Sequence, residues 1–120
     1  MKRTGPTDYT WRRTIRLLRK VAKENNAKIW KYIAELLEKP RRKRVVVNIS
    51  KINRYSMDGD AVIVPGKVLG AGSIDHKVTI AAMAFSKQAI DKIKAADGRA
   101  LHILELLNEN PKGSKVKVIV

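Results

Sequence analysis

Residues 40–49, PRRKRVVVNI, mark the point at which this chain changes from helix-forming to strand-forming sequence. Pro40 ends the helical pattern before it, because proline disfavours helical backbone angles in the residue that precedes it. The four basic residues that follow lead directly into three consecutive valines, and β-branched residues favour a strand. This stretch therefore divides the chain into a helical part, residues 9–39, and a mixed α/β part, residues 40–120. Residues 1–8 are expected to form a short basic tail.

Two amphipathic helices are predicted in the helical part. The first covers residues 9–25, with Thr7 or Asp8 as its cap, and the second covers residues 27–39. Asn25 and Asn26 between them are typical of a turn. The apolar stripe of the first helix consists of Trp11, Ile15, Leu18 and Ala22. The buried face of the second consists of Ile29, Trp30, Ile33, Leu36 and Leu37. Both tryptophans are thus expected in the core.

The α/β part is predicted to mix short strands and helices without a regular strand–helix–strand repeat. We expect a strand that ends at Pro65-Gly66, a glycine-containing connection after it, and a helix capped by Ser86 with Gly98 just past its end. The expected strands are residues 45–49, 61–64, 77–85, 101–103 and 116–120. The expected helical segments are residues 50–55, 87–96 and 105–110. The predicted fold class is therefore mixed α/β with N-terminal helices.

Composition excludes several classes of protein. A chain of 120 residues with 44% apolar side chains predicts a single folded domain. It has no cysteine, so neither a disulfide framework nor a cysteine-ligated zinc site is expected. No apolar run is long enough to span a membrane, and the start lacks an apolar signal core, so a cytoplasmic protein is expected. The 31% content of charged residues weakly favours a thermophilic source.

Positive charge is concentrated at the N-terminal end. The first 44 residues hold 15 of the 26 Lys and Arg and 4 of the 11 Asp and Glu, so they carry +11 of the net +15. Like charges at this density repel one another, and a polyanion offsets that repulsion. Binding phosphates also releases condensed counterions, which strengthens association regardless of sequence. The charge distribution predicts a nucleic-acid-binding protein.

The first helix presents most of this charge on one face. At about 100° per residue, six basic side chains and no acidic one fall within an arc of roughly 120° opposite the apolar stripe. They are Arg12, Arg13, Arg16, Arg19, Lys20 and Lys23. A face that served solubility alone would mix signs, as the second helix does with Glu35 and Glu38 among its lysines. The basic run at residues 41–44 adds to the predicted phosphate-contacting surface, although such a run also fits a nuclear-import signal.

No catalytic, metal or cofactor site is predicted. Gly70-Ala71-Gly72 lacks the third glycine of a dinucleotide-binding motif, because position 75 is Asp. We interpret it as a flexible or positive-φ connection that lets the backbone approach another group closely, for which a phosphate is one candidate. Neither His76 nor His102 has metal-ligand spacing or a neighbouring serine nucleophile, so no small-molecule substrate is expected. Among the aromatic side chains, Tyr55 is the candidate for stacking on a nucleic-acid base.

Several blocks of the chain resemble a known family. Together they span nearly the whole chain: residues 36–55, 58–60, 64–70, 77–82, 85–86 and 109–113. These blocks resemble the archaeal and eukaryotic large-subunit ribosomal protein L-eighteen-e family. Residues 67–86 also look like the C-terminal domain of the bacterial-type large-subunit protein fifteen family. The chain lacks the long extensions of eukaryotic members, which points to an archaeal form.

This resemblance implies a non-enzymatic structural protein of the large ribosomal subunit. It implies large-subunit ribosomal RNA and neighbouring ribosomal proteins as partners, and an irregular β-β-α superhelical domain after the helices. Charge and resemblance together predict RNA contacts for Lys2, Arg3, Arg12, Arg13, Arg16, Arg19, Lys20, Lys23, Arg41, Arg42, Lys43, Arg44, Asn48, Ser50, Lys51, Asn53, Arg54, Tyr55 and Lys67. Asn48 has a second interpretation as a hydrogen-bonding residue at a strand end.

Two other functions remain open from sequence. A DNA-compacting protein would also need a basic surface on paired helices. An RNA-processing enzyme would need a catalytic group, for which His76, His102 and Asp75 are the candidates.

Overall fold

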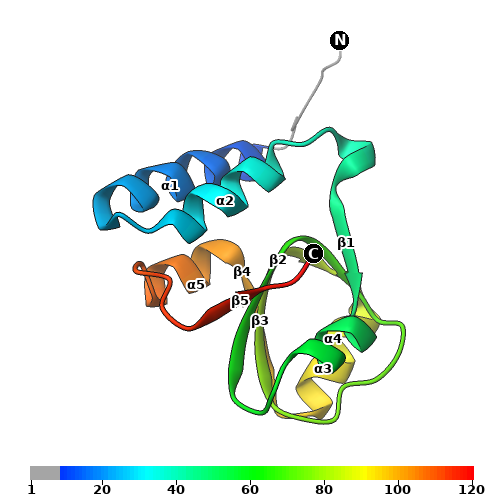
Figure 1. Cartoon of the computed structure of the whole chain (residues 1–120). Coiled ribbons are helices and arrows are strands. Elements are labelled where there is room, and N and C mark those ends of the chain that lie inside the picture. The colour runs from blue at the N-terminus through cyan, green and yellow to red at the C-terminus, as the bar shows by residue number, and fades with distance from the viewer. Residues whose placement is uncertain (1–8) are drawn as a thin grey trace.

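Helices cover both faces of a parallel β-sheet (Figure 1). The computed structural model describes residues 9–120, except for the side chain of Arg41. The elements in chain order are α1 (Tyr9–Asn25), α2 (Lys28–Leu37), the 3-10 helix η1 (Arg41–Lys43), β1 (Val45–Asn48), α3 (Ile49–Tyr55), β2 (Asp60–Leu69), β3 (Val78–Phe85), α4 (Lys87–Ala95), β4 (Arg99–His102), α5 (Ile103–Glu109) and β5 (Val116–Val118). The predicted mixed α/β class with N-terminal helices is confirmed. The predicted tail, Lys2, Arg3 and the cap at Thr7 or Asp8 lie outside the described residues.

The sheet has the strand order β1-β2-β3-β4, and every pairing is parallel. The outer edge of β2 is shared by two strands. β1 pairs with its C-terminal half, from Gly66 to Leu69, and β5 pairs with its N-terminal half, from Ala61 to Ile63. Two parallel strand–helix–strand units result, β1–α3–β2 and β3–α4–β4. The prediction of no regular strand–helix–strand repeat therefore holds only in part: α3 and α4 each connect two parallel strands, but β2 is followed by β3 without a helix between them.

Strand β2 is longer than predicted. It continues through Pro65 and Gly66, where the sequence predicted its end, and reaches Leu69. The register against β3 shifts between Val64 and Lys67, so a bulge accommodates the proline, which has no N–H to give to the ladder. At Gly66, a Cβ would lie 2.0 Å from the carbonyl oxygen of Val45. Glycine is therefore required for β1 to pair here.

Alternate residues of the sheet build two separate cores. Ile63 of β2 faces a cluster that contains the buried residues of α1, α2 and α5. Val62 and Val64, its neighbours in the strand, face a second cluster that contains those of α3 and α4. This two-residue period is the one expected for a strand buried on both faces. The molecule therefore has three layers, with the α1–α2 hairpin on one side and α3 and α4 on the other.

The N-terminal hairpin follows the prediction closely. α1 has the predicted bounds, and α2 begins and ends within two residues of the predicted ones. Asn26 between them has a φ of 51°, as a tight turn requires. Trp30 is completely buried and donates from its Nε1 to the carbonyl oxygen of Pro111 at 2.8 Å. This residue fastens the hairpin to the segment that follows α5.

The remaining elements differ from prediction by a few residues. Ser86 caps α4 as predicted, with its hydroxyl accepting from the backbone N–H of Ala89. The left-handed residue after α4 is Asp97, with a φ of 61°, rather than Gly98. α5 begins at Ile103, within the predicted strand, because His102 and Glu105 form a capping box.

Candidate nucleic-acid interface

The basic face of α1 is exposed along its length. All six predicted cations, Arg12, Arg13, Arg16, Arg19, Lys20 and Lys23, have exposed side chains. Below them, Ile15 and Leu18 are buried and Trp11 is half-buried, so the apolar stripe holds the opposite face against the core. Within residues 9–120, only Arg19 among the six pairs with a carboxylate. The other five therefore present uncompensated charge to the surroundings.

Arg19 forms its ion pair with Glu38, which follows the last turn of α2. Both side chains are more than two-fifths exposed, so solvent screens this pair and it contributes little to stability. The pair links the two helices of the hairpin and partly neutralises Arg19. We therefore expect a weaker contact with an external phosphate from Arg19 than from Arg16.

The basic run at residues 41–44 lies in a turn that packs against α1. Arg42 and Lys43 are exposed, and the backbone N–H of Lys43 donates to the carbonyl oxygen of Pro40 at 2.8 Å. Arg44 is half-buried, with its guanidinium carbon 4.0 Å from the centroid of the Trp11 ring. Such a cation–π contact ties the turn to the helix. The side chain of Arg41 lies outside the described residues.

A basic depression of about 300 Å³ lies where α1 meets the start of α2. Its cationic side chains are Arg19 and Lys23 from α1 and Lys28 and Lys31 from α2, and no acidic side chain of the described residues lines it. Lys28 and Lys31 were not predicted as RNA contacts, because they share the polar face of α2 with two glutamates. The Asn25-Asn26 turn was the available signal, since it brings the start of α2 beside the end of α1.

A second group of predicted residues lies on and around α3, where several have internal partners. The side-chain oxygen of Asn48 accepts from the backbone N–H of Ala71 at 3.2 Å, and that of Asn53 accepts from Asp75 at 3.1 Å. Lys51 donates to the main-chain oxygen of Val120. The hydrogen-bonding interpretation of Asn48 is confirmed. The other members of the group, Ser50, Arg54 and Tyr55, and Lys67 in β2 are exposed.

The glycine-containing connection, residues 70–77, packs against α3. Gly72 has a φ of 95°, and a Cβ there would lie 2.4 Å from Cβ of Ser50. Lys92 of α4 donates to the carbonyl oxygens of both Gly70 and Gly72, at 2.8 and 2.6 Å. The prediction of a positive-φ connection with close backbone approach is confirmed. The backbone that it approaches is that of α3.

His76 of this connection lies between Asp75 and Ser56, the C-cap residue of α3, in a hydrogen-bonded arrangement that resembles a catalytic triad. His76 Nε2 lies 2.8 Å from Ser56 Oγ, and His76 Nδ1 lies 2.9 Å from Asp75 Oδ1. The hydrogen bond with His76 lowers the pKa of the Asp75 carboxyl. Ser56, however, is buried and already donates its hydroxyl proton to the carbonyl oxygen of Ile52 at 2.6 Å. These hydrogen bonds therefore hold the connection against α3, and Ser56 is not an accessible nucleophile.

Within residues 9–120, no group of three or more His, Asp or Glu side chains is arranged to hold a metal ion. None of the helices in this range is long and apolar enough to cross a membrane.

Comparisons with known proteins agree with one another. A family model described as "Ribosomal proteins 50S-L15, 50S-L18e, 60S-L27A" matches residues 25–101. Among curated proteins, the chain is similar to three archaeal proteins, each called large ribosomal subunit protein eL18. The one from Pyrobaculum aerophilum is 45% identical over 98% of this chain and 96% of its own length. The one from Methanococcus maripaludis is 48% identical over 99% of both chains. The one from Methanoregula boonei is 51% identical over 88% of this chain and 87% of its own.

Proposed function

This chain belongs to the family of large-subunit ribosomal proteins described as 50S-L15, 50S-L18e and 60S-L27A, and from that premise we propose that it binds large-subunit ribosomal RNA through Lys– and Arg–phosphate contacts. The protein is a non-enzymatic structural constituent of the large ribosomal subunit, and the ribosome lies in the cytoplasm. Its proposed partners are that RNA and neighbouring large-subunit proteins. We also propose that the sheet domain has the irregular β-β-α superhelical arrangement that the family resemblance implies.

The observation that carries the RNA proposal is the unpaired charge on α1. Arg12, Arg13, Arg16, Lys20 and Lys23 are exposed and have no carboxylate partner within residues 9–120. Displacement of counterions by these groups gives affinity for any closely spaced row of phosphates. Arginines add geometric preference, because a planar guanidinium can donate two parallel hydrogen bonds to one phosphate.

The surroundings of α1 extend this surface. Arg42 and Lys43 lie in the turn that Arg44 attaches to Trp11, and the depression with Lys28 and Lys31 lies at the far end of the hairpin. A single helix thus connects two further basic regions. We propose that all three contact RNA backbone, and that the sheet and its buried cores hold them in fixed positions.

A salt titration tests the proposal. Replacement of Arg12, Arg13 and Arg16 with Ala should flatten the plot of log affinity against log salt for folded large-subunit ribosomal RNA. The expected change is roughly two to three in slope, because each lost phosphate contact removes about 0.7–0.9. The measurement is filter binding or fluorescence anisotropy between about 50 and 200 mM salt.

The matched control replaces Lys77, Lys87 and Lys94 with Ala. These side chains are also exposed and remove the same charge, but they lie outside the α1–α2 hairpin, two of them on α4. Both triple variants should unfold at the same urea concentration as the natural chain. Equal slopes for the two variants would show that net charge, and no particular face, binds the RNA.

Competition with duplex DNA distinguishes the DNA-compacting alternative. RNA displays 2′-hydroxyl groups in a wide minor groove, and DNA does not. We expect folded ribosomal RNA to resist displacement by an equal nucleotide concentration of duplex DNA. Equal competition would favour DNA compaction.

A further inference from the structure

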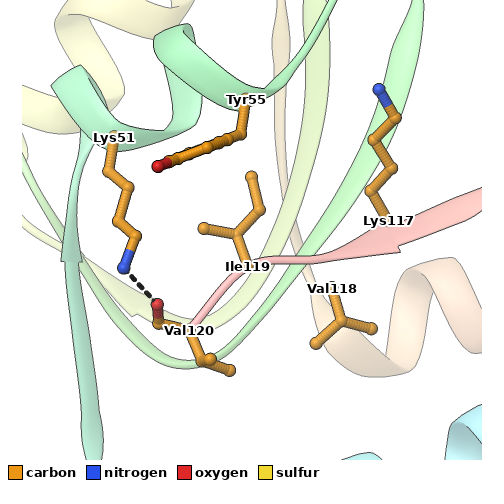
Figure 2. A pocket seen from close by; sticks show the side chains of 6 residues that line it. All are labelled: Lys51, Tyr55, Lys117, Val118, Ile119 and Val120. Atoms are coloured by element: carbon orange, nitrogen blue, oxygen red, sulfur yellow. Dashed lines mark hydrogen bonds between the residues drawn. The ribbon is translucent and has the colours of Figure 1, made fainter.

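An open depression of about 440 Å³ lies between α3 and the C-terminal segment (Figure 2). Tyr55 and Lys51 of α3 form one wall, and Val118, Ile119 and Val120 lie across from them. Lys117 of β5 completes the lining. Two elements from distant parts of the sequence therefore build it.

The depression combines an aromatic wall with an apolar floor. The Tyr55 side chain is 56% exposed and Val120 is 48% exposed, whereas Ile119 beneath them is buried. In Figure 2 the Tyr55 ring extends from α3 over the side of the depression where Ile119 lies. A flat apolar group could therefore stack on the ring and cover the two aliphatic side chains.

The rim of the depression is cationic. Lys51 uses one of its N–H donors on the main-chain oxygen of Val120, and Lys117 uses one on Asp60 Oδ2 at 2.7 Å. An ammonium has three donors, so each lysine is held in place and still has N–H groups to offer. The guanidinium carbon of Arg54 lies 5.7 Å from the centroid of the Tyr55 ring. Lys51 and Lys117 at the rim and Arg54 beside the ring thus bring three cations to the depression, of which Lys117 is paired with the Asp60 carboxylate.

We propose that this depression binds one unstacked nucleotide of single-stranded RNA. The base stacks on Tyr55 and covers Ile119 and Val120, while Lys51 and Lys117 contact the flanking phosphates. This inference rests on the proposed RNA-binding function but uses a different surface from the one on α1. A nucleotide joins a flat base, which fits the Tyr55 ring, to a negatively charged phosphate, which fits the lysines. An aliphatic side chain of a protein partner would leave the lysines unused.

The test is an NMR titration of the full chain with a single-stranded RNA tetranucleotide of adenosine. Its matched partner is a tetranucleotide of equal charge in which the bases are absent. We expect the adenosine tetranucleotide to shift the Tyr55 ring resonances and to bind more tightly than the abasic one. Equal affinity for the two would overturn the proposal, because it would mean attraction of phosphate alone.

Two variants separate stacking from charge. Tyr55→Ala should weaken binding of the tetranucleotide about 5- to 150-fold, the range expected for loss of one base–aromatic stack. Tyr55→Phe keeps the ring, so the affinity for the tetranucleotide should change less than about threefold, since stacking needs only the π face. Tyr55 is more than half exposed, so neither change should alter the urea unfolding midpoint. Unchanged binding in Tyr55→Ala would overturn the proposal.

The outcome is independent of the α1 surface. The variant with Arg12, Arg13 and Arg16 replaced should still show the Tyr55 shifts with the tetranucleotide. If those shifts are absent in the natural chain while its salt-dependent binding of folded ribosomal RNA persists, the nucleotide site is wrong and the proposed function stands. If an acidic peptide with a leucine side chain displaces the tetranucleotide and binds more tightly, the depression is a protein-docking site instead.

Discussion

The cations of α1 and those around α3 and α4 have different surroundings. On α1, Arg12, Arg13 and Arg16 project from an exposed helix face without a partner in residues 9–120. Around α3 and α4, Lys51 and Lys92 donate to main-chain oxygens. The same residue types therefore act outward on α1, whereas Lys92, and one of the three donors of Lys51, act inward. Charge count alone would treat them as equivalent.

The physical cause lies in the backbone nearby. Most carbonyl groups of α1 are bonded within the helix, so the lysines and arginines of this helix find few acceptors on their own element. The connection at residues 70–77 has irregular backbone, and Gly70 and Gly72 have carbonyl oxygens to be satisfied. A lysine placed beside such a segment becomes an internal donor. Lys92 is such a donor, whereas Arg12, Arg13 and Arg16 make no ion pair within residues 9–120.

The largest expected effect concerns the attachment of the hairpin, on which the outward role of α1 depends. Trp30→Ala should lower the free energy of unfolding by about 3–5 kcal/mol, because Trp30 is completely buried and bonded to Pro111. Urea unfolding followed by circular dichroism measures this. Tyr32→Ala, on the exposed face of the same helix, should change it by less than about 0.5 kcal/mol. Equal effects would mean that the hairpin is not fastened through Trp30.

A smaller effect tests the inward role. Lys92→Met keeps most of the side-chain length but removes both donations to Gly70 and Gly72, so we expect a loss of about 1–3 kcal/mol. Amide hydrogen exchange in residues 70–77 should accelerate, and the salt dependence of RNA binding should stay the same. Lys94→Met on the exposed side of α4 serves as the control. A changed salt slope in Lys92→Met would contradict the division between inward and outward cations.

The smallest effect depends on pH. The hydrogen bond from Lys117 lowers the pKa of the Asp60 carboxyl below its usual 3.8, and the backbone N–H of Met57 adds to this. A lowered folded-state pKa contributes stability that is present above the unfolded-state value and is lost as pH falls through the folded one. Lys117→Met should raise the Asp60 pKa toward 3.8. An NMR pH titration of the Asp60 carboxyl, compared with Lys112→Met, measures the change. An unmoved pKa would show that Lys117 is not held at the rim of the depression by this bond.

The helical hairpin was the most predictable part of the molecule. The 3.6-residue period defined the bounds of α1, and the apolar stripe identified Trp30 and Leu18 as buried. The cationic face was predictable for the same reason, because side chains on one helix have fixed relative directions. The predicted contacts of these side chains with RNA stay predictions. They depend on a partner that the chain does not contain.

The sheet was less predictable. Pro65 and Gly66 indicated an end to β2, because their local preferences favour a turn, but pairing with β1 and β3 overrides those preferences. Asn53 and Lys51 were selected as RNA contacts from the family resemblance. Their hydrogen bonds to Asp75 and Val120 join residues far apart in sequence, which no local pattern indicates.

The amino-acid sequence by itself determined the helices, the mixed α/β class and the one-sided charge of α1, because each depends on neighbours within a few residues. Only the tertiary structure decided which cations are already bonded, as Arg19 is to Glu38. It also placed Tyr55 beside Ile119 and Val120. These arrangements form only when separate elements pack together, since their energies depend on distances between residues that the chain itself leaves far apart.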